Sequence, residues 1–296
     1  MGKTILFGGS GFFGPVILSK DKSIISVGRT PPPKECENEH LQLNDLNEIE
    51  KLDKLDIDNV IFLIGSSNHH EINVKTKMGI DINVYPLNNA LSYFSKRKIK
   101  KFICFTTILL YDQNLFKLPV DEAQKINPFL NKYIFSKYLS EEVANFYSKE
   151  VPSIVVRLSN IYGYTKLRRP DLVPTIMQDI FEKEKVKIWS DKPIRDFIFT
   201  EDAADAVLKL IDSDYTGIIN LGSGIKSSLK EITNIIENLS GKKIISENKE
   251  VSGPMEFVTD ISKLKKIINW EPKFTIKTGL EKTYKIMQLY HKNNLS

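Results

Sequence analysis

The sequence predicts an α/β fold in which a doubly wound parallel sheet carries a smaller C-terminal α/β lid. From the start to about residue 160, short β-branched apolar runs alternate with longer helical patterns, and this alternation is typical of βαβ units with parallel strands. Several runs are apolar throughout, as strands covered on both faces should be. Later segments are punctuated by proline. We therefore expect one domain over residues 1–165 and a lid over residues 166–296, from which some segments return to the sheet.

Five strands are expected in the first domain, with helices between them. The strand runs are TILFGG (4–9), SIISVG (23–28), NVIFLIG (59–65), KFICFTT (101–107) and PSIVVRLS (152–159). Helical patterns lie over 15–20, 80–96 and 131–149. In the second region, helices are expected over 173–183, 202–211, 228–239 and 277–290, and a short strand over 187–189.

Composition and charge exclude several classes of protein. The chain has 296 residues, of which 41% are hydrophobic and 27% charged, and these values favour an ordinary globular protein. Its 42 basic and 37 acidic side chains are scattered, so no basic stripe indicates nucleic-acid binding. No apolar stretch approaches the roughly 20 residues that span a bilayer.

The opening residues, the two cysteines and two adjacent histidines bear on the compartment of the protein and on metal binding. The opening residues lack a signal-peptide pattern. Cys36 and Cys104 have no Cys or His neighbours at metal-ligand spacing, so we predict a cytoplasmic protein with two unpaired thiols and no metal site. The adjacent His69 and His70 favour a surface loop over a metal site.

A glycine-rich turn follows the first strand. Gly8, Gly11 and Gly14 form a G-x-x-G-x-x-G series that leads into the first helix. One glycine permits the tight turn, one lets the backbone approach a pyrophosphate, and one lets the helix pack against the strand. The turn therefore predicts a Rossmann-type dinucleotide site, in which Phe12 and Phe13 are expected to contribute contacts. A glycine-rich turn without a ligand is the alternative.

The end of the second strand bears on which dinucleotide binds. An NAD enzyme usually places an acidic residue there for the ribose hydroxyls, whereas this chain has Gly28 followed by Arg29. A guanidinium suits a 2′-phosphate, so NADP is favoured over NAD as the cofactor. A solvated loop arginine is the alternative.

Tyr133 and Lys137 lie four residues apart in a helical segment, so they share one face. The charge of Lys137 can lower the pKa of the phenol, and its amine can reach a ribose hydroxyl. For such a pair by itself an ordinary helix face is the alternative. The order of features supports a site, because the glycine turn comes first, then a strand that ends in Thr106 and Thr107, and then the tyrosine helix.

The chain resembles, over almost its whole length, the extended short-chain dehydrogenase/reductase family, the group that contains UDP-galactose 4-epimerase and the nucleotide-sugar dehydratases and ketoreductases. FICFTTILLYD is similar to the family's fifth strand, whose Ser/Thr-rich end is followed four residues later by a tyrosine, here Tyr111. That spacing in the resemblance assigns the catalytic hydroxyl to Thr107. KYIFSK is similar to the tyrosine and lysine motif. RLSNIYG, IRDFIFTEDAADAV, INLGSG and TDISKLKKIINWEP are similar to later family segments.

The resemblance also implies ligand contacts. Asp45 and Leu46 are similar to the pair that binds adenine. Asn160 is implied near the sugar diphosphate, and Arg195 on the diphosphate itself, where a guanidinium can bind two oxygens at once. A salt bridge to Asp196 or Asp202 is the alternative for Arg195. Family members commonly form homodimers through the fourth helix and the tyrosine helix, so the resemblance implies a homodimer.

The resemblance implies hydride transfer between a nicotinamide and C4 of a nucleotide-diphosphate sugar. Tyr133 would exchange the hydroxyl proton, Thr107 would hydrogen-bond the same oxygen, and Lys137 would hold the tyrosine near its working pKa. The 4,6-dehydratases carry an acid pair where this chain has Ile108 and Leu109, which argues against dehydration. A 4-ketoreductase or dehydrogenase is slightly favoured, a 4-epimerase that retains NAD is the alternative, and a non-catalytic dinucleotide sensor is a distant one.

Overall fold

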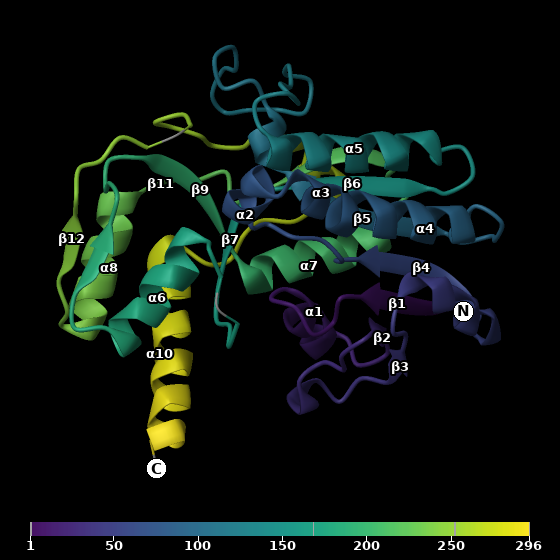
Figure 1. Cartoon of the computed structure of the whole chain (residues 1–296), viewed down its shortest axis with the longest axis horizontal. Helices are drawn as coiled ribbons and strands as arrows, with labels where there is room; N and C mark the ends of the chain where they lie inside the picture. The colour runs from purple at the N-terminus through teal and green to yellow at the C-terminus, as the bar shows by residue number, and fades with distance from the viewer. Residues whose placement is uncertain (1, 168, 252, 296) are drawn as a thin grey trace.

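A seven-stranded parallel sheet forms the centre of the computed structural model, which describes residues 2–167, 169–251 and 253–295 (Figure 1). Its strands in spatial order are β10 (Gly217–Leu221), β6 (Ser153–Leu158), β5 (Lys101–Thr107), β4 (Ile57–Phe62), β1 (Lys3–Phe7), β2 (Ile25–Gly28) and β3 (His40–Gln42). The strand order reverses between β1 and β4, and in such sheets a crevice opens at the carboxyl ends of the strands. The predicted doubly wound α/β fold is confirmed.

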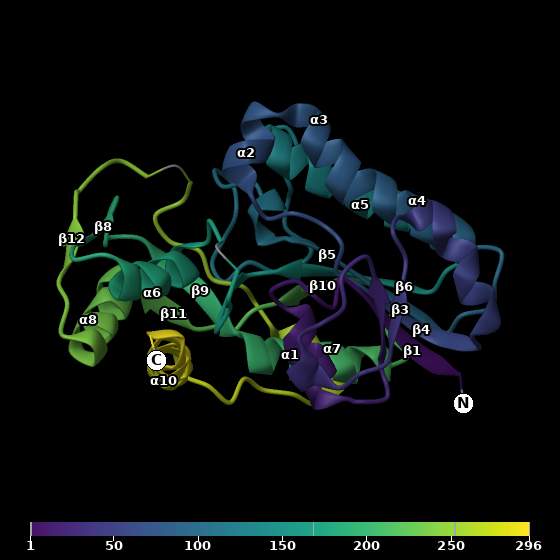
Figure 2. The same cartoon turned by 60° about the horizontal axis from the view of Figure 1, so that its bottom comes forward.

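Helices cover both faces of this sheet (Figures 1 and 2). On one face lie α1 (Gly14–Lys20) and α7 (Thr200–Ile211), and on the other α4 (Tyr85–Phe94) and α5 (Lys132–Phe146). Successive residues of β4 serve the two faces, because Val60 belongs to the core cluster under α4 and Ile61 to the cluster under α7. Both layers are apolar, which explains why the strand runs show no polar alternation.

The helix expected over 80–96 is divided. The structure has α3 (Thr76–Gly79), a π turn over Ile80–Val84, and then α4. Pro86 lies in the first turn of α4 and lacks a backbone N–H, so the regular hydrogen-bond ladder cannot run through it. The surface loop expected at His69 and His70 is also wrong in part, since both residues are exposed but begin helix α2 (His69–Val74).

A second, smaller layer system holds the C-terminal lid. It contains α6 (Leu172–Glu182), α8 (Leu229–Ser240) and α10 (Ile276–Leu295), which share one apolar core cluster. Its sheets pair β11 (Lys226–Ser228), β9 (Ile194–Phe199) and β7 (Asn160–Tyr162), and separately β12 (Ile244–Ser246) with β8 (Val186–Ile188). The lid helices and the short strand expected from the sequence are present within a few residues of their predicted bounds.

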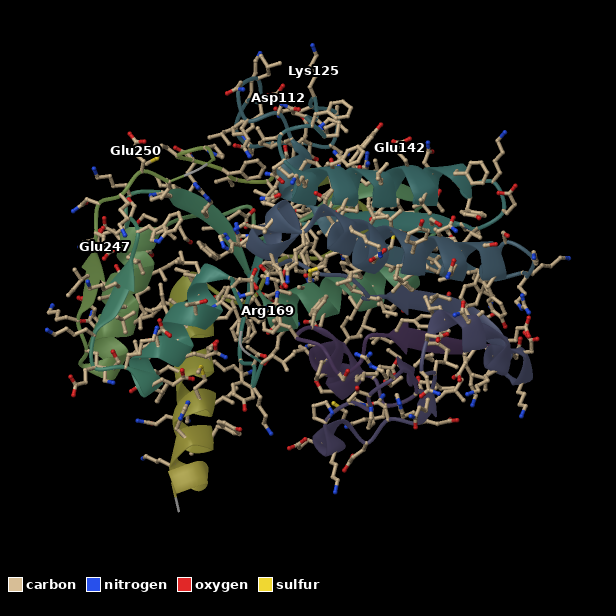
Figure 3. All side chains as sticks on the ribbon, in the orientation of Figure 1. Asp112, Lys125, Glu142, Arg169, Glu247 and Glu250 are labelled. Atoms are coloured by element: carbon tan, nitrogen blue, oxygen red, sulfur yellow. The ribbon has the colours of Figure 1, made fainter. Side chains whose placement is uncertain are left out.

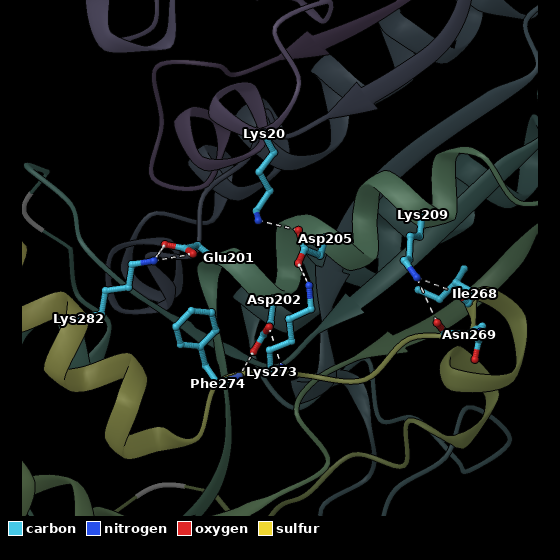
Figure 4. A network of polar contacts seen from close by, with 10 residues as sticks. All are labelled: Lys20, Glu201, Asp202, Asp205, Lys209, Ile268, Asn269, Lys273, Phe274 and Lys282. Carbon is cyan, nitrogen blue, oxygen red and sulfur yellow. Dashed lines mark hydrogen bonds and ion pairs between the residues drawn. The ribbon is translucent and has the colours of Figure 1, made fainter.

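Three segments of the region after residue 165 return to the main sheet, namely α7, β10 and α9 (Ser262–Ile268). A polar network anchors the chain between α9 and α10 to α7 (Figure 4): Asp202 accepts the backbone N–H groups of Lys273 and Phe274, each at 2.9 Å. Burial raises the pKa of Asp202, and these two hydrogen bonds counteract that shift. The division at residue 165 stays a prediction. No helix in the described part of the chain is long and apolar enough to cross a membrane.

Candidate active site

A cavity of about 760 Å³ lies between the carboxyl ends of the sheet and the lid. Most residues predicted for the site line it: Gly8, Gly11, Phe12, Phe13, Gly14, Thr107, Tyr133, Lys137, Asn160 and Arg195. A second cavity of about 500 Å³ shares Gly8 with the first and is lined by the remaining three, Arg29, Asp45 and Leu46. The structure therefore brings all of the predicted residues into two adjoining cavities.

The glycine turn between β1 and α1 has no room for a side chain at Gly14 but has room at Gly11. A Cβ on Gly14 would lie 2.5 Å from the carbonyl oxygen of Gly8 and 2.7 Å from the Cα of Gly9. A Cβ on Gly11 would meet only the Gly8 oxygen, at 3.3 Å. The turn therefore packs tightly at Gly14 and stays open at Gly11, and this fits a loop that a pyrophosphate can approach closely.

Tyr133 and Thr107 meet at the inner end of the larger cavity. Tyr133 is 5% exposed, and Thr107 ends β5 with 6% exposure. Burial raises the pKa of the Tyr133 phenol, and its hydrogen bond to Thr107 opposes that rise. The side chain of Asn131 caps α5 by accepting the N–H of Ile134 at 2.9 Å, and this fixes the turn that carries the phenol.

Lys137 lies one helical turn after Tyr133 and lines the same cavity. Its side chain is 9% exposed, and burial lowers the pKa of its ammonium to about 8. In the described part of the chain no carboxylate forms an ion pair with it. Its Nζ approaches Gly65, at 3.3 Å from the point that a Cβ there would occupy. The ammonium is thus held beside the dinucleotide crevice with its charge uncompensated.

A buried charge network behind this helix was not predicted. Glu141, one turn after Lys137, accepts two hydrogen bonds from Arg157 of β6, at 2.9 and 2.7 Å. It also accepts a hydrogen bond from the Thr106 hydroxyl, with 2.7 Å between Thr106 Oγ1 and Glu141 Oε1. Glu141 and Arg157 are 5% and 3% exposed. The network ties α5 to β5 and β6, so it fixes Tyr133 relative to Thr107.

Arg195 has no carboxylate partner among the described residues. Its Nη1 donates to the carbonyl oxygens of Ile194 at 2.9 Å and Met255 at 3.2 Å. The alternative salt bridge to Asp196 or Asp202 is wrong, because Asp196 accepts hydrogen bonds from Ser223 and Thr259, and Asp202 accepts them from backbone N–H groups. The remaining guanidinium donors are available to an anion in the cavity.

Asn160 is held beside Arg195. Its side-chain amide donates to the carbonyl oxygen of Asp196 at 2.9 Å, and the amide oxygen has no hydrogen-bond donor among the described residues. In the smaller cavity Asp45 is engaged locally, since its carboxylate accepts the N–H of Asn47 at 2.7 Å and caps the 3₁₀ turn Leu46–Lys54. Arg29 is exposed at the rim.

Sequence reasoning missed several residues of the cavity, among them Arg169 and His69. Arg169 donates from Nη2 to Ser67 Oγ at 2.8 Å and from Nε to Asp171 at 2.7 Å, and its guanidinium lies 4.4 Å from the ring centre of Phe12. Figure 3 labels Arg169 at the centre of the molecule, between the lid and the main sheet. His69 packs edge-on against the Tyr133 ring, with ring centres 6.1 Å apart. The sequence does place two adjacent arginines shortly after the RLSNIYG segment, and this pair could have indicated Arg169 as a site residue.

The fold and the two cavities define a dinucleotide-dependent enzyme of Rossmann type. The profile of the NAD dependent epimerase/dehydratase family matches residues 4–222. The chain belongs to that family. The predicted family, enzyme class and dinucleotide cofactor are thereby confirmed, and the choice between NAD and NADP stays a prediction.

Several relatives match nearly the whole chain. It is 28% identical to UDP-glucuronate 4-epimerase of Thermodesulfobacterium geofontis, over 96% of this chain and 95% of that one. It is 26% identical to a putative UDP-glucose 4-epimerase of Methanocaldococcus jannaschii, over 96% and 98%. Among solved structures, UDP-glucose 4-epimerase of Thermotoga maritima with UDP-glucose has a TM-score of 0.88 at 20% identity, covering 99% and 100%. MoeE5 with UDP-glucuronic acid and NAD has a TM-score of 0.86 at 17% identity, covering 98% and 100%.

Proposed function

We propose that this chain is a nucleotide-diphosphate sugar 4-epimerase that retains its dinucleotide. The observation that carries the proposal is the convergence of Thr107 and Tyr133 in one cavity, with Arg195 lining the same cavity. The sequence slightly favoured a 4-ketoreductase. Two relatives that cover 96% of the chain carry 4-epimerase names, which supports the alternative better.

The residues of the cavity divide the chemistry between them. Tyr133 takes the C4 hydroxyl proton as the sugar is oxidised to its 4-ketone and returns it after reduction, while Thr107 hydrogen-bonds the same oxygen. Lys137 places its ammonium in the same cavity, one helical turn from Tyr133, while the charge of Arg169 lowers the pKa of the Tyr133 phenol against the effect of burial. Arg195 and Asn160 bind the sugar diphosphate. The glycine turn and Lys137 would hold the dinucleotide, which would supply reversible hydride exchange at C4.

Two features argue against other reactions. Ile108 and Leu109 follow Thr107 in the cavity and cannot donate or accept a proton, so elimination of water has no acid there. Arg169 joins the lid side to Phe12 and Ser67, which flank the dinucleotide crevice. A contact across that crevice favours a retained cofactor, which an epimerase needs and a reductase does not.

Product analysis tests the proposal. Purified protein is expected to interconvert UDP-glucose-type and UDP-galactose-type epimers at C4 without added dinucleotide, and denatured protein is expected to release a stoichiometric dinucleotide detectable by mass spectrometry. Tyr133→Phe should lower turnover by about 100-fold or more. Net, stoichiometric oxidation of added NADPH by a 4-keto nucleotide sugar, without epimer formation, would contradict the epimerase.

A 4-ketoreductase remains the second candidate because of Arg29. Its guanidinium lies at the rim of the smaller cavity, beside the place where Asp45 and Leu46 would contact the adenosine. A cation there suits the 2′-phosphate of NADP. Tighter binding of NADPH than of NADH, lost in Arg29→Ala, would support this candidate.

A further inference from the structure

A fully buried carboxylate, that of Asp196, lies next to the predicted diphosphate site. Arg195 and Asp196 are neighbours in β9, and successive side chains of a strand point to opposite faces. Arg195 lines the larger cavity, whereas Asp196 is not among the residues that line it. The carboxylate therefore lies on the side of β9 that faces away from the cavity, where a ligand in the cavity does not meet it.

Two segments that come later in the chain donate hydrogen bonds to this carboxylate. Ser223 donates to Oδ1 from its backbone N–H at 2.8 Å and from its hydroxyl at 2.7 Å. Gly224 and Thr259 donate to Oδ2 from their backbone N–H groups, at 3.1 and 3.2 Å, and the Thr259 hydroxyl donates to Oδ2 as well. The two segments can approach because residue 222 is a glycine, where a Cβ would collide with Thr259 Oγ1 and Asp196 Oδ2. Hydrogen bonds to an ionised acceptor are strong, so the carboxylate holds both segments firmly against β9.

The segment that ends at Thr259 connects the buried carboxylate to Arg195. It runs beside β9, since Ile194 donates its backbone N–H to the Met255 carbonyl oxygen at 2.8 Å and Phe257 donates its own to the Ile194 oxygen at 3.0 Å. The same Met255 oxygen accepts a hydrogen bond from Arg195 Nη1 at 3.2 Å. One end of this segment is thus fixed by the carboxylate, and the other end holds the guanidinium.

The backbone of Asp196 holds the other residue that we assign to the sugar diphosphate. Its carbonyl oxygen accepts the side-chain amide of Asn160 at 2.9 Å. Asn160 lies in β7, which pairs with β9 in parallel, Asn160 opposite Phe197. A binding site gains affinity when its groups are held in the binding geometry before the ligand arrives. The hydrogen bonds around Asp196 provide such a restraint for both residues.

We propose that Asp196 and Thr259 are positioning residues for the diphosphate site, and that their hydrogen bond holds the Arg195 guanidinium, through the segment 255–259, where it can bind the phosphates. Neither residue is among those that line the cavity. This inference rests on one part of the proposed function, the binding of a sugar diphosphate by Arg195, and does not depend on the reaction at C4.

Calorimetric titration of the intact protein with UDP, dTDP and GDP tests the inference, because binding requires no turnover. Thr259→Val replaces the hydroxyl with a methyl group, and we expect the tightest of the three nucleotides to bind about tenfold more weakly. Thr259→Ser keeps the hydroxyl, so its affinity should stay within about twofold of wild type. Asp196→Asn turns an amide toward some of the donors and should lose at least as much affinity as Thr259→Val.

Thr283→Val is the matched control for the valine variant. Thr283 is also fully buried, its hydroxyl donates to the Gly279 carbonyl oxygen at 2.8 Å within α10, and it is not among the residues that line the cavity. This variant should lower the melting temperature without weakening nucleotide binding. If thermal denaturation shows that Thr259→Val is unfolded, Thr259→Ala replaces it.

A double-mutant cycle with Arg195→Met separates positioning from a general loss of stability. Arg195→Met alone should weaken nucleotide binding by about tenfold to a hundredfold, since it removes hydrogen bonds to a charged ligand. If Thr259 acts through Arg195, adding Thr259→Val to Arg195→Met should cost less than about twofold more. A full tenfold loss in both backgrounds, an unchanged affinity in Thr259→Val, or a folded wild type that binds none of the three nucleotides would overturn the inference. Nucleotide binding with the expected coupling, but no epimerisation of UDP-glucose or UDP-galactose, would refute the proposed epimerase and leave the positioning role intact.

Discussion

Lys137 carries a charge that the fold itself makes costly. Burial lowers its pKa from 10.5 to about 8, so between these values the unfolded chain holds the proton that the folded chain has lost. Stability from this group therefore rises as pH increases through that window, and below pH 8 the cost is about 3 kcal/mol. We interpret this loss of folding stability as a consequence of placing the Lys137 ammonium in the active-site cavity.

Replacing Lys137 with Met should therefore stabilise the dinucleotide-free protein while abolishing turnover. At pH 7 we expect the free energy of unfolding to rise by up to about 3 kcal/mol, because an apolar side chain of similar length carries no desolvation cost. The gain should shrink toward pH 10. Urea denaturation at both pH values measures it, and a gain that does not change with pH would contradict the assigned cause.

Glu141 and Arg157 form the opposite case, in which the buried charges compensate each other. Glu141→Gln leaves the Arg157 guanidinium buried without its carboxylate, and we expect a loss of about 3–5 kcal/mol in the free energy of unfolding. The control is Glu271→Gln. Glu271 pairs with Lys265 at 3.0 Å, and their side chains are 74% and 42% exposed, so it should cost less than about 1 kcal/mol. Similar costs for both variants, by denaturant titration, would show that burial of the pair is unimportant.

The site residues that the sequence could predict are those with a fixed local motif. Gly8, Gly11 and Gly14 follow one strand at set spacing, and Tyr133 and Lys137 follow helical periodicity. Arg169 and Glu141 act through partners 102 and 35 residues away, Ser67 and Thr106. No local pattern encodes such pairings, because only the tertiary fold brings these side chains together.

At the turn into α1, a single added carbon atom would meet backbone atoms that cannot easily move. Gly14→Ala would press a Cβ against the backbone of Gly8 and Gly9, which cannot give way without moving β1 or α1. We expect a loss of stability of a few kcal/mol together with loss of dinucleotide binding. Gly11→Ala meets one atom at 3.3 Å, so it should keep most of the stability and impair binding alone. Thermal denaturation and dinucleotide titration of both variants test this, and equal destabilisation would contradict it.

Helices α4 and α5 bear on the predicted homodimer. Leu87, Leu91 and Phe94 are buried in the core of the protomer itself, so they are not free to form an interface. Phe146 is 77% exposed at the end of α5 and remains available. The homodimer stays a prediction, and it rests on the exposed side of α5 at Phe146.

Phe146→Glu is expected to convert a dimer to a monomer, because a carboxylate cannot be buried in an apolar interface. Its control is Phe129→Glu, since Phe129 is 78% exposed on the loop before α5, outside both helices. Light scattering measures the mass. A monomeric wild type, or a dimer that survives Phe146→Glu, would contradict the prediction.

The strands divide into those that the sequence predicted and those that it did not. The strands β1, β2, β4, β5 and β6 are buried on both faces and appear as continuous apolar runs. The strands β7, β8, β11 and β12 have three residues each, too few for a periodicity, and only β8 was expected. In β9 the charged pair Arg195 and Asp196 interrupts the apolar run that would predict a strand. Asp196 is nevertheless fully buried, and it accepts hydrogen bonds from Ser223 and Thr259.

At the scale of the whole molecule, Arg169 joins the lid side to the dinucleotide-binding side. It precedes α6 in the chain and contacts Phe12 of the glycine turn and Ser67 after β4. These two residues flank the crevice at which the sheet order reverses. This contact lies across the crevice in which we propose that the dinucleotide binds, so we expect the rate of release to depend on it.

Arg169→Ala is therefore expected to release the dinucleotide faster. A hydrogen bond to a charged group contributes about 1.5–3 kcal/mol, which corresponds to an increase in the dissociation rate of roughly tenfold to a hundredfold. Lys166→Ala is the matched control, because Lys166 pairs with Glu35 at 3.9 Å while both side chains are more than half exposed, and such a pair contributes little. Stopped-flow fluorescence of the reduced dinucleotide measures both rates. If the two variants release it equally fast, Arg169 does not hold the crevice closed, and the structural argument for a retained cofactor loses its support.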